Sequence, residues 1–251
     1  MTWWNAAILL LAGVGGGLVG SIAGLASLTT YPALLAVGLP PVAANVTNTV
    51  ALVFNGVGSI AGSRPELRGQ GPWLVRTVPL MVLGGAAGAG LLLLTPASGF
   101  EKLVPILIAL ASLTIVLPRR ALDGAKPRKR RAVVLLEGAA IFLVGVYAGY
   151  FGAAAGVVLL ALLLRAGGAT LAHANAAKNV MLGISNSVAA VAFAFLAPVD
   201  WLAVVPLGIG CLIGSRLGPV VVRHSPATPL RILIGVAGLC LAVKLGIDAY
   251  S

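Results

Sequence analysis

The sequence predicts an all-α integral membrane protein that consists of two repeats of inverted topology. Three observations carry this prediction. Of the 251 residues, 59% are hydrophobic and only 9% are charged, and the mean hydropathy is +1.06. Apolar runs near the ~20 residues that cross a bilayer recur along the chain, and the two halves of the chain are similar. A soluble domain of this length needs many more charged residues on its surface.

Proline, glycine and charged residues divide the chain into eight apolar stretches. In chain order they cover residues 4–37, 41–62, 72–94, 101–117, 132–165, 171–197, 199–219 and 229–249. The first and the fifth are too long for a single crossing, with about 34 residues each. A straight helix of that length spans about 50 Å, whereas the hydrocarbon core of a bilayer is about 30 Å thick.

Each of the two long stretches contains a glycine-rich segment, GVGGGLVGSIAG at 13–24 and GYFGAAAG at 149–156. These segments predict that each long stretch folds as two shorter helices joined inside the membrane. Each repeat then consists of one broken, re-entrant-like helix pair and three transmembrane helices. The sequence leaves open whether the broken stretches are re-entrant or cross the membrane twice.

The similarity between the halves appears at an offset of about 130 residues. The segment 36–52 aligns with 165–182 and places Asn45 over Asn175, and WLVRTVPLMVLG at 73–84 is similar to WLAVVPLGIG at 201–210. A repeated unit of this size is typical of secondary transporters. We therefore expect three parts, which are a first repeat at 1–118, a basic cytoplasmic linker at 119–131 and a second repeat at 132–251.

The net charge of +11 comes from basic residues in short loops, which favours the positive-inside pattern over nucleic-acid binding. If both broken stretches return to the side they entered from, one face holds Arg64, Arg68, seven basic residues from Arg119 to Arg131, Arg165, Arg223 and Arg231. The opposite face then holds little more than Lys102 and Lys244. This arrangement makes the halves inverted repeats and places both termini outside the cytoplasm.

Motifs for metals, nucleotides and cofactors do not occur in the sequence. Cys211 and Cys240 lie in predicted spans without a metal-ligand spacing, and there is no phosphate-binding loop or dinucleotide fingerprint. We therefore expect no metal and no cofactor, and no ATP hydrolysis by this chain.

Several motifs together resemble one family of membrane proteins. They are GSIAGLASLTTYPALLAVGLPPVAANVTNTVAL from Gly20, the following NGVGSIAG, YFGAAAGVVLLALLL, and HANAAKNV. This pattern resembles the sulfite exporter TauE/SafE family over both halves of the chain. The resemblance implies a multi-pass protein of the bacterial inner membrane that moves sulfite, sulfonates and related small anions, generally outward. In such a membrane the loop charges place both termini in the periplasm. Many members carry Gly-x-Gly-Gly-Gly where this chain has Gly24-Leu25-Ala26-Ser27, so the resemblance does not identify the anion.

Polar residues at spacings of three and four form one stripe on the second apolar stretch and one on the sixth. The stripes contain Asn45, Asn48, Thr49 and Asn55, and Asn175, Lys178, Asn179 and Asn186. Because such groups lack hydrogen-bond partners in lipid, we expect the stripes to bind substrate. We expect the helix breaks to line the same site through Gly20, Gly24, Ser27, Gly149, Gly152 and Gly156. The ends of the broken helices would direct partial positive charge at an anion.

The stripes also have a purely structural interpretation. Asn, Ser and Thr side chains join membrane helices without touching a substrate. Lys178 is either a ligand of the anion, or it extends to the interface or pairs with Glu137. His173 is expected at the membrane interface rather than on a proton path.

The function that these patterns favour is a secondary transporter of a small anion, and the family resemblance implies an exporter of sulfite, an organosulfonate or a related sulfur oxyanion. The anion would be bound at the midplane between the repeats. A channel-like anion pore and a non-transporting membrane assembly factor are the alternatives. An intramembrane enzyme that uses Ser27 and His173 is disfavoured because the surrounding sequence has no nucleophile motif. The expected partners are the anion and the lipid bilayer, without nucleic acid, and a homodimer remains an open alternative.

Overall fold

The computed structural model describes residues 2–116, 131–165 and 170–224, together with Val236, Leu239, Cys240, Val243 and Ile247. Every regular element in this part of the chain is a helix. The basic linker predicted at 119–131 lies outside the described residues except for Arg131. The eighth apolar stretch, predicted at 229–249, also lies outside them except for those five single positions.

Ten helices cover the described chain. They are α1 (Trp3–Ala23), α2 (Ala26–Ala36), α3 (Pro41–Gly62), α4 (Arg64–Leu67), α5 (Gly71–Leu94), α6 (Ala97–Val116), α7 (Arg131–Tyr150), α8 (Ala155–Arg165), α9 (Leu171–Leu196) and α10 (Trp201–His224). Four of them, α1, α5, α9 and α10, are long and apolar enough to cross a membrane. Large apolar side chains such as Leu94 and Phe195 are more than four-fifths exposed, which suits a surface that faces lipid. The prediction of an all-α membrane protein is confirmed at this level.

Both long stretches are broken into two helices, as the glycine-rich segments predict. The α1 helix ends at Gly24, which has a φ of 75° and donates its N–H to Gly20 O at 2.7 Å. Glycine adopts this left-handed conformation without the strain of a Cβ. The second break covers residues 151–154, between α7 and α8, with Gly152 at a φ of 72°.

The first break is shorter than the segment that predicts it. Residues 13–23 are helical, and only Gly24 and Leu25 separate α1 from α2. The glycines at 13 and 17 instead let α1 approach α10, because a Cβ at either position would overlap the backbone of that helix. In this part of the segment the glycines therefore serve close packing.

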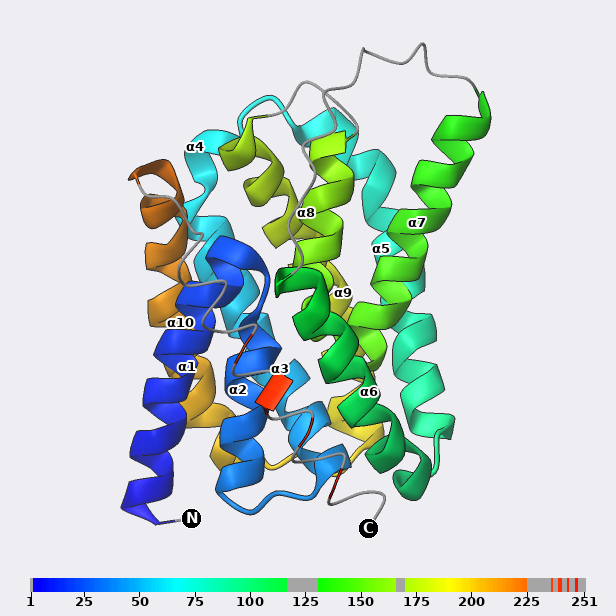
Figure 1. Cartoon of the computed structure of the whole chain (residues 1–251). Helices are drawn as coiled ribbons and strands as arrows, with labels where there is room; N and C mark the ends of the chain where they lie inside the picture. The colour runs from blue at the N-terminus through cyan, green and yellow to red at the C-terminus, as the bar shows by residue number, and fades with distance from the viewer. Residues whose placement is uncertain are drawn as a thin grey trace.

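The two broken pairs point toward each other. In Figure 1, α1 and α2 occupy the end of the molecule where the N-terminus lies, and α7 and α8 reach inward from the opposite end. Their breaks meet inside the protein, where a Cβ on Gly24 would overlap Cα of Gly156. Since backbone touches backbone at this point, glycine is required on both sides of the contact.

Close glycine contacts divide the helices into two groups. Gly13 and Gly17 of α1 pack against α10, and Gly84 and Gly88 of α5 pack against α7. The α3 helix also packs on α10, and α9 packs on α5. We therefore describe α1, α3 and α10 as one group and α5, α7 and α9 as the other, although α9 packs on α3 as extensively as on α5. Each group combines helices from both halves of the chain.

The two groups meet where α3 crosses α9 (Figure 1). At this crossing a Cβ on Gly56 would lie 3.0 Å from Cα of Gly183. The helix crossing and the contact between the two breaks surround the same central region, which holds the candidate site.

Candidate functional site

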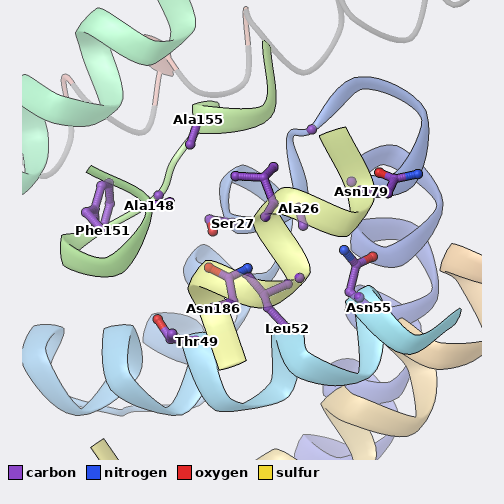
Figure 2. A pocket seen from close by; sticks show the side chains of 16 residues that line it. Ala26, Ser27, Thr49, Leu52, Asn55, Ala148, Phe151, Ala155, Asn179 and Asn186 are labelled. Carbon is purple, nitrogen blue, oxygen red and sulfur yellow. The ribbon is translucent and has the colours of Figure 1, made fainter. Parts of the chain in front are cut away.

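A pocket lies where the two breaks meet α3 and α9. The centre of a water molecule can occupy about 30 Å³ of it, and the space free of protein atoms reaches about 520 Å³ only when the open side is included. Figure 2 shows side chains from both broken pairs and from α3 and α9 around it, among them Ser27 of α2, Asn55 of α3, Ala155 of α8 and Asn186 of α9. The pocket therefore lies between the parts of the chain that carry the two polar stripes and the two breaks.

Eight of the fourteen predicted site residues line this pocket. They are Gly20, Gly24, Ser27, Thr49, Asn55, Gly152, Asn179 and Asn186. The sequence interpretation did not include several further lining residues, among them Ala26, Gly56, Phe151 and Gly183. Helical spacing could have indicated Gly56, since it follows Thr49 and Leu52 on the same face of α3.

The N-terminal ends of two helices lie at the pocket. Ala26 and Ser27 open α2, Ala155 opens α8, and all three line the pocket. The first N–H groups of a helix have no acceptor within the helix. Leu25 at the N-cap of α2 supplies no side-chain hydrogen bond, whereas the Ala155 N–H that opens α8 donates to Gly152 O at 3.1 Å. Helix N-termini also carry partial positive charge, so two of them at one pocket favour an anion.

The polar side chains at the pocket are neutral. Asn55 and Thr49 come from α3, Asn179 and Asn186 come from α9, and none of the described lining residues carries a formal charge. The Oδ1 atom of Asn55 is buried without a hydrogen-bond partner in the described part of the chain. These amide and hydroxyl groups can donate hydrogen bonds to an oxyanion from two opposite helices.

Three of the six other predicted residues do not line the pocket but contact the segments that line it. Asn48 donates from Nδ2 to Ser27 Oγ at 3.1 Å and accepts a hydrogen bond from Thr30, which fixes the first turn of α2. Gly149 packs against Gly85 of α5, and Gly156 packs against Gly24. These positions hold the helix ends in place rather than contacting the pocket.

The remaining three predicted residues bind the broken helices at their C-terminal ends. Asn175 donates from Nδ2 to Ser21 O at 2.9 Å. Lys178 donates from Nζ to Gly20 O at 3.2 Å and to Ser21 O at 3.3 Å. On the other side, Asn45 donates to Tyr150 O, the last carbonyl of α7, at 2.9 Å. Asn45 and Asn175, which the repeat alignment superimposes, thus make similar contacts near the carbonyl ends of opposite broken helices.

The Lys178 side chain is completely buried, so it does not extend to the membrane interface. Neither of its described hydrogen bonds goes to Glu137. Its ammonium binds the carbonyl end of α1, and Gly20 and Gly24 at that end line the pocket. His173, in contrast, is exposed at the start of α9, where its Nδ1 lies 2.7 Å from Thr170 Oγ1.

Known proteins resemble this chain over nearly its whole length. The family model described as "Sulfite exporter TauE/SafE" matches residues 9–245. A "Probable membrane transporter protein" of Haemophilus influenzae is 27% identical over 248 residues, which is 96% of this chain and 94% of the relative. The "Probable membrane transporter protein YfcA" of Escherichia coli is 27% identical over 97% of this chain and 90% of its own length. No solved structure matches the chain. Because the family model covers both halves, the chain belongs to the sulfite exporter TauE/SafE family of membrane transporters.

Proposed function

We propose that this protein is a secondary transporter that binds a small anion in the pocket between the two helix breaks. The observation that carries the proposal is the position of α2 and α8, whose N-terminal ends line one pocket. Partial positive charge from both helices and amide groups from α3 and α9 replace the water that a buried anion loses. The family name favours sulfite, an organosulfonate or a related sulfur oxyanion as the substrate, and export as the direction.

The proposed architecture is a pair of inverted-topology repeats at 1–118 and 132–251. Two features support it. The broken pairs reach inward from opposite ends of the molecule (Figure 1), and Asn45 and Asn175, related by the repeat offset, each bind the carbonyl end of the opposite repeat's broken helix. Inverted repeats with broken helices at the midplane are common among secondary transporters.

Alternating access in this architecture would move the two helix groups against each other. Close glycine contacts pack α1 on α10 and α5 on α7. Each of these two helix pairs would move as one unit. The crossing of α3 with α9 and the contact of Gly24 with Gly156 are the joints between these units. The moving bodies proposed here therefore differ from the two halves of the sequence, because each body takes helices from both.

The proposed location is the bacterial inner membrane, with both termini in the periplasm and the linker at 119–131 in the cytoplasm. The charge of the loops supports this orientation. Reporter fusions after Arg130 and after Tyr250 are expected to report opposite sides, the first cytoplasmic and the second periplasmic. Reports from a single side would contradict the inverted arrangement.

Transport by purified protein in liposomes tests the proposed function. We expect the protein to exchange external labelled sulfite or methanesulfonate for internal unlabelled anion. Replacing Asn186, which lines the pocket, with leucine is expected to lower this exchange at least about tenfold, because an amide donor is lost and the pocket is narrowed. Val191 lies on the same helix with an exposed side chain, so Val191→Leu is the matched control and should exchange like the parent.

The same assay separates the alternatives. A transporter exchanges anions at a rate that saturates with anion concentration. A channel-like pore conducts an anion current that needs no anion moving in the opposite direction, and Asn186→Leu would block this current. A membrane assembly factor would give no anion flux at all. An intramembrane hydrolase receives no support from Ser27, whose described side-chain hydrogen bond is with Asn48 rather than with His173.

A further inference from the structure

The buried ammonium of Lys178 is the feature from which a further inference follows. Its Nζ is bonded to Gly20 O and Ser21 O, and the side chain has no exposed surface. Gly20 lines the pocket, and so does Asn179, the next residue after Lys178. The ammonium thus bonds a residue that lines the pocket, and Lys178 itself is not a lining residue.

The carbonyl end of a helix carries partial negative charge. The α1 helix ends at the pocket, so without a partner its last carbonyls would repel an anion bound there. Lys178, Asn175 and Asn179 all donate hydrogen bonds to these carbonyls. Two of the three are neutral amides, and only Lys178 brings a formal charge that offsets the negative end of α1.

Few other charges face this region. The helices α1, α2 and α3 contain no acidic or basic residue. Helices that contact α9 carry Glu66 of α4, Arg76 of α5, Glu137 of α7 and Arg216 of α10. None of these four lines the pocket, and both described hydrogen bonds of the Lys178 ammonium go to carbonyls of α1. The second titratable group of α9, His173, is exposed at the start of that helix.

The other repeat supplies no second cation. The residue that the repeat offset aligns with Lys178 is Asn48, and it bonds Ser27 and Thr30 at the start of α2. The broken helix α7 has the neutral Asn45 at its carbonyl end. Among the described residues, the centre of the molecule therefore contains one formal positive charge, beside a pocket that is otherwise neutral.

We propose that Lys178 is the fixed countercharge of the transported anion, which makes the substrate a monovalent oxyanion. This inference rests on the proposed function and specifies its substrate class. A monovalent anion in the pocket makes the site neutral, whereas a divalent anion leaves one uncompensated negative charge in a region of low dielectric. Hydrogensulfite and sulfonates with one acid group fit the site, and sulfate does not. Lys178 acts through the end of α1, as a positioning residue.

Methanesulfonate and sulfate provide a matched pair of probes. Both have tetrahedral sulfur and nearly the same size, and they differ by one unit of charge. We expect the parent protein in liposomes to exchange methanesulfonate at least about tenfold faster than sulfate at equal concentration. Equal exchange of the two anions, or faster exchange of sulfate, would overturn the proposal that Lys178 is the countercharge of a monovalent anion.

Three variants of Lys178 separate its charge from its packing. Lys178→Arg keeps the charge, Lys178→Gln keeps hydrogen-bond donors without the charge, and Lys178→Met keeps only the apolar stem. We expect Lys178→Arg to keep the preference for methanesulfonate at a lower rate. We expect the two neutral variants to raise the KM for methanesulfonate at least about tenfold. Membrane insertion and unfolding temperature are measured in parallel, because a purely structural lysine would lower stability without changing the preference between anions.

Each outcome has a definite meaning. A neutral variant with the parent's KM and preference overturns the proposal. If the neutral variants fail to insert, the anion preference of the parent and of Lys178→Arg still decides it. If the parent exchanges no anion of either charge, nor sulfite, the proposed function itself fails.

Discussion

Replacing Gly156 with leucine is expected to abolish transport. A Cβ at this position would overlap Cα of Gly24, and the same Cβ would come within 3.0 Å of Leu182 Cδ1. The overlap involves backbone on both sides, so rotation of a side chain cannot relieve it. The two breaks must separate, and their backbone groups then lose the packing that shields them at membrane depth. The measurement is anion exchange in liposomes, normalised to the amount of inserted protein.

Gly90 provides the control for this substitution. It is a helical glycine of α5 with no other atom near the position of a Cβ, so Gly90→Leu adds the same side chain without a collision. We expect this variant to insert and to exchange anions like the parent. Normal flux in Gly156→Leu would show that the contact between the breaks is not needed for transport.

The two breaks illustrate what the sequence can reveal about this fold. A stretch of about 34 apolar residues exceeds the bilayer, and glycine is the residue that ends a helix in the left-handed conformation. Length and glycine content together therefore predict two broken pairs, and the structure contains both. The exact position of the first break was not predictable, because the sequence does not distinguish a glycine that allows two helices to pack closely from a glycine that ends a helix. In the structure the contact with α10 marks Gly13 and Gly17 as packing residues, and the left-handed φ marks Gly24 as the residue that ends the helix.

The polar stripes show a similar limit. Helical periodicity places Asn175, Lys178 and Asn179 on one face of α9, but it does not reveal which element lies opposite that face. In the structure this face meets the carbonyl end of α1, so amides and ammonium satisfy acceptors that the helix break leaves open. Asn179 and Asn186 also line the pocket. The stripe thus combines the two interpretations that the sequence left open, since some residues join helices and others line the pocket.

Asn45 and Asn175 are expected to differ in importance although they occupy equivalent positions in the repeats. Each donates from Nδ2 to the carbonyl end of a broken helix, and each has a buried Oδ1 without a partner in the described structure. The acceptors differ, because Tyr150 O receives its described hydrogen bond from Asn45 alone. Ser21 O receives hydrogen bonds from Asn175, Lys178 and Asn179.

Asn45→Leu should therefore destabilise the protein more than Asn175→Leu. The first variant leaves a carbonyl of α7 unsatisfied in the membrane interior, which costs about 1–3 kcal/mol. The second leaves Ser21 O with two donors. For a chain of this size the difference corresponds to about 2–4 °C in unfolding temperature per kcal/mol, measurable by thermal unfolding in detergent. Both Oδ1 atoms are buried and neither has a described partner. The effect on stability of removing this atom is therefore the same in the two variants and cancels in the comparison. An equal or larger loss of stability in Asn175→Leu would contradict this prediction. It would mean that Lys178 and Asn179 do not replace the missing donor at Ser21 O, and that the end of α1 depends on Asn175 as the end of α7 depends on Asn45.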